Sequence, residues 1–362
     1  MDETLLDYKC PNCGGRLEFN SDVQQMKCPF CDSVVDVSSL RDKDTVLNDE
    51  PEDSADWTSG AGGEWAAGET DGMRVFVCQS CGGEIIGDAV TGATTCPYCD
   101  NPVVMAGSFS GALKPDYVIP FKLDKEAAKA ALTKHLKGKK LLPKSFRSQN
   151  HIDEIKGIYV PFWLFDADVN ADVHFKTTKV RHWSDARYEY TETSYFDVLR
   201  AGDLSFDRVP ADGSSKMADD LMESIEPYDF AGAVPFQTAY LSGYLADKYD
   251  VDENANRPRV QARMRHSTET EFRKTVTGYS SVSLENSRAR FYNGKTKYAL
   301  YPVWILNTTW RDQTYTFAMN GQTGKFVGNL PMDKGAFVRY FLLTALGSAA
   351  AVFLLQWLAS RL

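Results

Sequence analysis

The sequence predicts an α+β protein: two small four-cysteine zinc ribbons, a mixed α/β body with an antiparallel sheet, and one C-terminal transmembrane helix. Three observations lead to this prediction. All eight cysteines fall into two copies of one spacing. Aromatic and β-branched runs alternate with helix-like segments through the middle of the chain. The chain then closes on a long apolar run that carries no charge.

The cysteines repeat a pattern with two residues inside each CxxC pair and fourteen between the pairs. Four thiolates at this spacing can surround zinc as a tetrahedron, each sulfur about 2.3 Å from the metal. Disulfides would need an oxidising compartment, for which no secretory signal opens the chain, and a redox CxxC would not recur at a fixed interval. Iron is the other metal that four thiolates suit. We expect two Zn²⁺ ions per chain, bound by Cys10, Cys13, Cys28 and Cys31 and by Cys78, Cys81, Cys96 and Cys99.

The composition divides the chain into five expected segments. They are a first zinc ribbon at 1–40, an acidic disordered linker at 41–73, a second zinc ribbon at 74–105, an α+β cytosolic body at 106–335 and a transmembrane helix at 336–362.

The expected linker carries ten acidic residues and one base between Asp42 and Gly72, with few branched apolar residues. That composition is typical of disordered segments. Trp57 and Trp65 are unusual in it. They are either anchors of a short motif that orders on a partner, or side chains that rest on the protein's own ribbons.

The body contains several segments with helix or strand signals. Asp124 and Gly138 are expected to cap a helix between them. The motifs YVPFWL (159–164) and YPVWIL (301–306) resemble each other, which two related halves or two strands with similar cores would explain. Other helices are expected over 214–227, 238–250 and 257–276, and strands over 157–175, 188–198, 298–310 and 314–319, followed by an Asn320-Gly321 hairpin turn.

Residues 340–359 form the apolar run, which at 1.5 Å per residue would span about 30 Å as a helix. Lys325, Lys334 and Arg339 precede it, whereas only Arg361 follows. This charge bias predicts a single-pass cell-membrane protein with its N-terminal part in the cytoplasm. Small residues within the run would allow another such helix to pack closely, and so an oligomer.

No catalytic motif is found in the sequence: it lacks a phosphate-binding GxxxxGK[ST] loop, HExxH and GxSxG. The five histidines are scattered. Asp166, Asp168 and Asp172 would share one face of a strand, where a solvated face is the simpler explanation than a carboxylate site. We therefore do not expect an enzyme.

Charge argues against nucleic acid as a partner. Residues 1–40 hold seven acids and three bases, and residues 74–105 hold three acids and one base. Zinc bound by four thiolates adds further negative charge, whereas nucleic-acid-binding surfaces are basic. Ten bases against three acids gather instead over 114–147, where anionic membrane headgroups are one potential contact and a solvated helix face is the other.

The order of segments, with motifs such as VIPFKLDKEAA, LLPKSF, IKGIYVPFWLFDA and FAMNGQTGKFVGNLP, resembles bacterial TFIIB-type zinc-ribbon membrane proteins over nearly the whole chain. The resemblance implies a stress-response module with SPFH-domain or virion-core-like proteins and PspA-like proteins. It implies an adaptor that recruits a soluble partner to the membrane, with the eight cysteines as zinc ligands and no catalytic residues. Similar proteins are often labelled replication-restart helicases, a label that the missing phosphate loop contradicts. The alternative function is a membrane-anchored, nucleic-acid-binding regulator.

Overall fold

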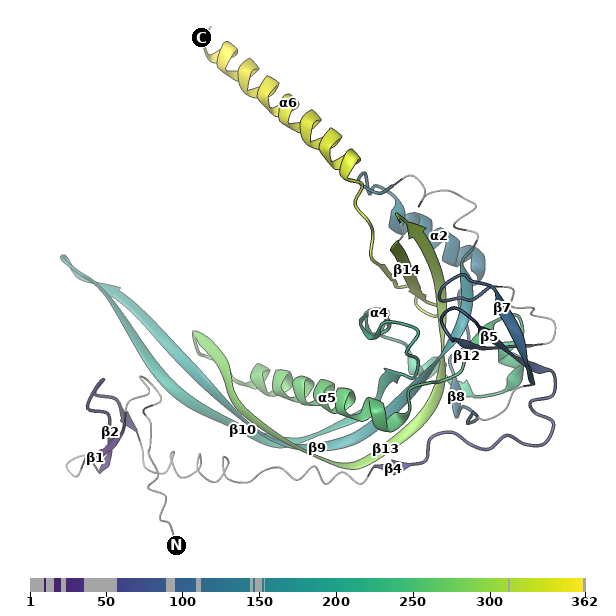
Figure 1. The fold of residues 1–362 in the computed structure, drawn as a ribbon. Coiled ribbons are helices and arrows are strands. Elements are labelled where there is room, and N and C mark those ends of the chain that lie inside the picture. The colour runs from purple at the N-terminus through teal and green to yellow at the C-terminus, as the bar shows by residue number, and fades with distance from the viewer. Residues whose placement is uncertain are drawn as a thin grey trace. The chain divides into compact units, whose positions relative to one another are not determined.

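The computed structural model describes residues 10, 16–20, 24–35, 57–88, 95–108, 112–143, 146, 152, 154–311 and 313–360. The chain forms two compact units (Figure 1). Unit 1 comprises Met1–Trp57, Ala167–Phe206 and Ala262–Gly294. Unit 2 comprises Thr58–Asp166, Asp207–Gln261 and Lys295–Leu362. Each unit is described by itself below.

A 12-stranded sheet organises the body, and its strands are mostly antiparallel, as the sequence predicts. Three of the described pairs are parallel instead: β8 with β13, β9 with β12, and the short strand β4 (Thr58–Ser59) with β13. The main path runs β11 (Val234–Pro235), β8 (Tyr117–Val118), β13 (Ser281–Trp310), β9 (Lys156–Ser184), β12 (Leu245–Asp247), β6 (Glu84–Asp88), β5 (Met73–Cys78) and β7 (Val103–Ser108).

The two similar motifs lie on neighbouring strands, YVPFWL on β9 and YPVWIL on β13. The rings of Phe162 and Tyr301 stack 4.4 Å apart, centroid to centroid, across this pair. Trp163 and Trp304 are both buried. Nearly every side chain of both motifs is buried, which explains why these runs carry no polar alternation.

Helix α2 (Lys125–Leu136) begins as predicted, with the Asp124 side chain accepting from the Ala127 N–H at 2.8 Å. Ala128, Leu132 and Leu136 form its buried side, and Gly138 follows with a φ of +80°. The helix packs in one hydrophobic cluster with strand β14 (Gln313–Asn320) and strand β15 (Phe326–Gly328). These two strands form the predicted Asn-Gly hairpin, in which the Asn320 side chain accepts from two backbone N–H groups of the turn.

The prediction of a helix over 238–250 is wrong. A short 3₁₀ helix, η3 (Thr238–Leu241), is followed by Gly243 with a φ of +81°, and then by strand β12. β12 pairs with β9 on one side and with β6 on the other, so sheet pairing decides its structure. The helix expected over 214–227 is reduced to α4 (Asp219–Ser224).

The third expected helix, over 257–276, is confirmed as α5 (Glu253–Thr275), although it begins earlier. The Asp252 carboxylate accepts from the Ala255 N–H at 2.7 Å and caps this start. Pro258 consequently lies inside the helix rather than in its first turn.

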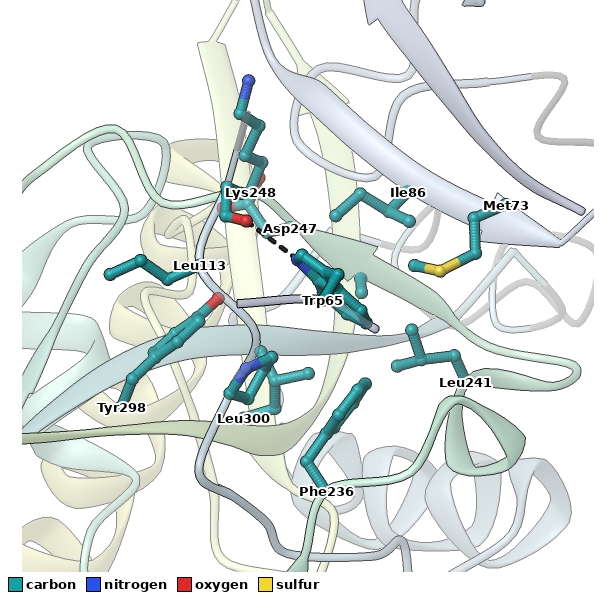
Figure 2. Close-up of a pocket in the computed structure, with 13 residues that line it drawn as sticks. Trp65, Met73, Ile86, Leu113, Phe236, Leu241, Asp247, Lys248, Tyr298 and Leu300 are labelled. Carbon is teal, nitrogen blue, oxygen red and sulfur yellow. Dashed lines mark hydrogen bonds between the residues drawn. The ribbon is translucent and has the colours of Figure 1, made fainter. Parts of the chain in front are cut away.

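The prediction of disorder over 41–73 is wrong for residues 57–73, which are folded. Residues 41–56 lie outside the described residues. Strand β4 (Thr58–Ser59) pairs with β13. The Trp65 indole donates to the Ala112 carbonyl at 2.8 Å and packs edge-on against Phe236, within the apolar pocket shown in Figure 2. Of the two alternatives for Trp65, packing against the protein itself is observed, although the contacts are with residues of the body and not with a ribbon.

Unit 1 contains the first ribbon, an antiparallel three-stranded sheet of β1 (Glu18–Asn20), β2 (Gln25–Lys27) and β3 (Val34–Val35). It also contains the outer parts of β9 and β13 and of strand β10 (Glu189–Asp212), which pairs with β9. The second part of α5 covers these strands, where Phe272 lies over Gly202 and the Arg265 guanidinium lies over the Phe291 ring. Trp57 lies against the backbone of Gly294.

Helix α6 (Lys334–Ala359) has 26 residues and is long and apolar enough to cross a membrane. None of its most apolar 18-residue window is buried against the rest of the chain. The Asp333 side chain caps its first turn by accepting from Gly335 N–H at 2.9 Å. At 1.5 Å per residue the helix is about 39 Å long, more than the hydrocarbon core of a bilayer.

Candidate metal centres

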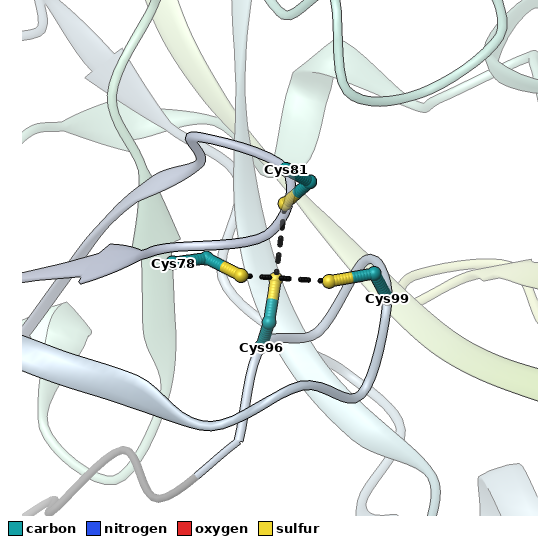
Figure 3. Close-up of side chains that lie close together, drawn as sticks. All are labelled: Cys78, Cys81, Cys96 and Cys99. Atoms are coloured by element: carbon teal, nitrogen blue, oxygen red, sulfur yellow. Dashed lines mark hydrogen bonds between the residues drawn. The ribbon is translucent and has the colours of Figure 1, made fainter.

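Cys78, Cys81, Cys96 and Cys99 meet at one point (Figure 3). Their four sulfurs lie within 4.8 Å of one another, with Cys78–Cys99 at 3.5 Å and Cys81–Cys96 at 3.6 Å. A tetrahedron with metal–sulfur bonds of about 2.3 Å has edges of about 3.8 Å, whereas a disulfide bond is about 2.0 Å. The spacing therefore fits four ligands of one tetrahedral metal.

Each CxxC pair of this cluster lies in the same kind of backbone turn. The Gly82 N–H donates to the Cys78 carbonyl at 2.9 Å, and the Asp100 N–H donates to the Cys96 carbonyl at 3.1 Å. Gly82 and Asp100 occupy the same place in the two turns and both have positive φ, +71° and +57°. This conformation costs glycine least and is tolerated by aspartate, so the sequence is locally compatible with the turn.

The surroundings of the sulfurs act on their proton affinity in opposite directions. Burial raises the pKa of the Cys96 thiol. Burial also raises that of Cys99, but hydrogen bonds from Asn101 outweigh it and bring the pKa to about 7. A metal ion would bring all four sulfurs to the same protonation state, because it binds thiolates and releases their protons.

Lys156 supplies positive charge beside the cluster. Its ammonium donates to the Cys96 carbonyl at 3.1 Å and to the Asp100 carboxylate at 2.8 Å. Four thiolates and one Zn²⁺ leave a formal charge of −2, so a nearby cation is electrostatically favourable.

The second cluster is built into the body and is not a separate module. Strand β6 of the ribbon pairs with β12 of the body. Asn307 on β13 donates from its side chain to the Pro97 carbonyl at 2.6 Å. Tyr98, between Cys96 and Cys99, is half-buried with its hydroxyl fully buried beside Asp247, and burial followed by the Asp247 charge raises its pKa. Cys78 and Cys96 accordingly belong to the main hydrophobic core of the body.

The first cluster brings Cys10, Cys28 and Cys31 together, with the sulfurs of Cys10 and Cys31 3.6 Å apart. Cys13 lies outside the described residues. The turn after Cys28 repeats the geometry of the second cluster. The Asp32 N–H donates to the Cys28 carbonyl at 3.0 Å, and Asp32 has a φ of +56°.

Comparison with known proteins gives one relative with extensive identity. The chain is 33% identical over 348 residues to a Bacillus subtilis (strain 168) protein described as "Uncharacterized protein YdjG", and the match covers 96% of each chain. The chain belongs to the YdjG family. No family model matches the sequence, and no solved structure matches it either.

The three aspartates of the predicted strand face do not form a described metal group. In unit 2, Asp166 accepts from the Arg208 N–H at 2.7 Å. In unit 1, Asp168 accepts from Ser205 at 2.6 Å and from Asn293 at 2.8 Å. Hydrogen bonds within the strands account for both carboxylates.

Three residues that matter at the second cluster were not singled out from the sequence: Lys156, Asn307 and Asn101. Asn101 follows the last CxxC pair closely, and an amide after a metal-binding turn is a usable local signal for a sulfur hydrogen bond. Lys156 and Asn307 lie 60 and 210 residues from their partners in the cluster, and no local pattern could have found them.

Proposed function

We propose that this chain is a zinc-binding, membrane-anchored cytosolic adaptor that recruits a soluble partner to the membrane. The partner is an SPFH-domain or virion-core-like protein or a PspA-like protein, and the process is an envelope stress response. The observation that carries the proposal is an exposed aromatic surface at the end of a long β-hairpin, in a chain that also has a membrane-length apolar helix. One element would fix the protein to the bilayer and the other would bind the partner.

In this proposal two Zn²⁺ ions, one per cluster, are structural. The sulfur distances and the paired turns support a tetrahedral thiolate site, in which all four positions are protein ligands. Such a closed site stabilises a fold and leaves no position for a substrate.

The proposed orientation places both units in the cytoplasm, with α6 as the single span. Its support is the charge bias of the sequence, Lys325, Lys334 and Arg339 before the apolar run against Arg361 after it.

The surface proposed to bind the partner is the tip of the β9–β10 hairpin, residues Arg181–Tyr190, here called the hairpin tip. Trp183 and Tyr190 stack with ring centroids 5.4 Å apart, and the Arg181 guanidinium lies 5.3 Å from the Trp183 ring. Trp183 is 44% exposed and Tyr188 is 64% exposed. Trp, Tyr and Arg are the residue types enriched where protein interfaces gain most of their affinity.

Hydrogen bonds to one side chain fix the turn of the hairpin tip. The Asp185 carboxylate accepts from the N–H groups of Arg187 and Tyr188 and from the Tyr190 hydroxyl, each at 2.8 Å. These hydrogen bonds lower the pKa of Asp185. A surface held in place in this way loses less conformational entropy on binding, which favours affinity.

Charge at the hairpin tip supports a protein partner over nucleic acid. Arg181 and Arg187 are offset by Asp185 and Glu189. A nucleic-acid-binding surface would present a net excess of bases along the strand pair.

Purification of the full chain from membranes in mild detergent tests the proposal. We expect an SPFH-type or PspA-like protein to co-purify and to remain bound after nuclease treatment. Co-purification that nuclease abolishes would support the membrane-anchored nucleic-acid regulator and overturn the adaptor. Recovery of the chain without any stoichiometric protein would also contradict the adaptor.

A further inference from the structure

The residues just after α2 contact the start of α6 within unit 2 (Figure 1). The Asp333 N–H, at the cap of α6, donates to the Leu141 carbonyl at 2.8 Å. The Lys140 ammonium lies 5.8 Å from the centroid of the Tyr340 ring. Ala336 in the first turn of α6 is buried. The residues that follow α2 therefore lie at the point where the apolar helix leaves the folded body.

Five exposed cations occur on the described residues of these two segments. We call them the basic collar: Lys134, Lys137, Lys140, Lys334 and Arg339. Within the described part of the chain, none of the five forms an ion pair. The acid nearest in sequence to α6, Asp333, uses its carboxylate to cap that helix.

The environment of the collar is also electropositive where the side chains are less exposed. The Lys139 ammonium lies 3.0 Å from the His135 ring. Burial lowers the pKa of Lys139, while burial and the charge of Lys139 lower that of His135. The His135 Nε2 is within hydrogen-bond distance of this ammonium and the lowered pKa favours the neutral imidazole, so Lys139 carries the positive charge of the pair.

The position of the collar around the start of α6 indicates which anion it would bind. Tyr340, which contacts Lys140, is 40% exposed, and the neighbouring Phe337, Val338 and Phe341 are exposed apolar side chains. With α6 in a bilayer, Tyr340 lies at the interface that aromatic residues favour, and the apolar side chains enter the hydrocarbon. Lysine and arginine on the body side then lie at headgroup level.

We propose that the basic collar binds the anionic phospholipid headgroups of the leaflet that α6 enters. This rests on α6 being the membrane anchor and goes beyond recruitment of a partner. The collar would hold unit 2 against the membrane surface, where an anchor helix alone would leave it free to pivot. A basic side chain near an anionic membrane contributes about fivefold in lipid affinity, the equivalent of about 1 kcal/mol.

The test uses the full chain reconstituted into nanodiscs of phosphatidylcholine alone or of phosphatidylcholine with phosphatidylglycerol. Amine acylation, read by mass spectrometry, reports how accessible Lys137 and Lys140 are, with Lys295 as an exposed reference lysine on β13. We expect phosphatidylglycerol to slow acylation of Lys137 and Lys140 about fivefold relative to Lys295, and high salt to reverse this.

A second measurement is the ratio of phosphatidylglycerol to phosphatidylcholine that stays with the protein after mild detergent extraction from mixed vesicles. The double substitution Lys137→Gln with Lys140→Gln should reduce this enrichment by about 25-fold if the two contributions add. The matched control, Lys274→Gln with Lys295→Gln, removes two exposed lysines elsewhere and should leave the enrichment unchanged.

Equal acylation of the collar lysines in both lipids, or equal lipid ratios for the two double variants, would overturn the proposal. Protection by inorganic phosphate in phosphatidylcholine nanodiscs, to the extent seen with phosphatidylglycerol, would assign the collar to free anions and would also overturn it. Partner co-purification is measured separately, so failure here is distinguishable from failure of the adaptor function.

Discussion

The side-chain amide of Asn307 donates to the carbonyl of Pro97 at 2.6 Å, and so connects strand β13 to the turn between Cys96 and Cys99 of the second cysteine cluster. Asn307 is buried, and its own amide oxygen accepts from Thr316 at 2.8 Å. The second cysteine cluster and the central sheet are therefore connected directly, and the stability of each should depend on the other.

Cys96→Ser should remove one zinc and destabilise the body, because Cys96 is fully buried in the core cluster that includes β9 and β13. A structural zinc site contributes several kcal/mol, so the main thermal transition should fall by about 10 °C or more. Cys28→Ser should also remove one zinc but leave that transition in place, since Cys28 belongs to a separate small cluster.

Zinc analysis by mass spectrometry and thermal unfolding by circular dichroism check both substitutions. Two zinc ions per wild-type chain are expected, and a count near one would contradict the double-site assignment. An equal loss of melting temperature in the two variants would show that the second centre is not specially coupled to the body.

Asn307→Ala should lower the free energy of unfolding by about 1–3 kcal/mol, because it leaves the buried Pro97 carbonyl without its donor. It should also speed zinc loss to a chelator, since Pro97 lies next to the ligand Cys96. Urea unfolding and chelator kinetics measure the two effects. Thr316→Val, which removes only the partner of the Asn307 oxygen, is the control and should leave chelation kinetics near those of the wild type.

The local features of this fold could be predicted from the sequence. The Cys28 and Cys96 turns, the Asp124 cap of α2 and the Asn320-Gly321 hairpin each depend on residues a few positions apart. Strand β12 could not, because its three residues are fixed by pairing with β9 and β6, which are distant in the sequence.

The same distinction holds for the outer part of β13, whose sequence SVSLENSRARFYNGK has no apolar face to reveal a strand. Its pairing is set by partners on β9, such as Thr178, which contacts Ser281 at 2.6 Å from 103 residues away. At the candidate site the grouping of the cysteines was predictable because it follows from their spacing in the sequence. The groups that fix the ligands to the body were not, because they arrive from other strands.

Asp247→Asn should stabilise the protein increasingly as pH rises. Burial raises the pKa of Asp247 from its ordinary 3.8 to about 7, in surroundings that include Tyr98, Ser214, Lys216 and Asp250. The folded state therefore binds this proton more tightly than the unfolded state. The stabilisation of the wild-type fold by this bound proton is complete below about pH 4. It is lost at about 1.4 kcal/mol per pH unit as the pH rises to about 7.

Urea unfolding at pH 5 and pH 8 checks this prediction. The variant has no ionisable group at this position, so its free energy of unfolding should rise relative to that of the wild type between the two pH values. Asp250→Asn is the opposite control. Burial raises the pKa of Asp250, but hydrogen bonds from Ser215 outweigh it and the pKa is lowered, so its contribution is present at both pH values. A constant difference between wild type and Asp247→Asn would contradict the assignment.

Deleting residues 336–362 should move the protein from the membrane to the soluble fraction, because α6 is the described helix that can span a bilayer. Protease added to intact cells should not cleave the full-length protein, whereas protease added to inverted vesicles should. Fractionation with immunodetection measures both. Cleavage from outside intact cells would show that the orientation inferred from Lys325, Lys334 and Arg339 is reversed.

Trp183→Ala with Tyr190→Ala should weaken recruitment of the soluble partner and leave zinc content and membrane insertion unchanged. The two rings stack on each other at an exposed turn, so their removal deletes contact surface without opening a core cavity. Truncating an aromatic anchor commonly costs about 2 kcal/mol or more, which corresponds to about 30-fold in affinity.

Leu284→Ala is the control, because Leu284 is also exposed in unit 1 but lies on β13, outside the hairpin tip. Co-purification yield against the wild type is the measurement, and loss of recruitment equally with Leu284→Ala would indicate a broader surface of unit 1. Unchanged recruitment in the double variant would exclude the hairpin tip and leave the first ribbon as the surface to test next.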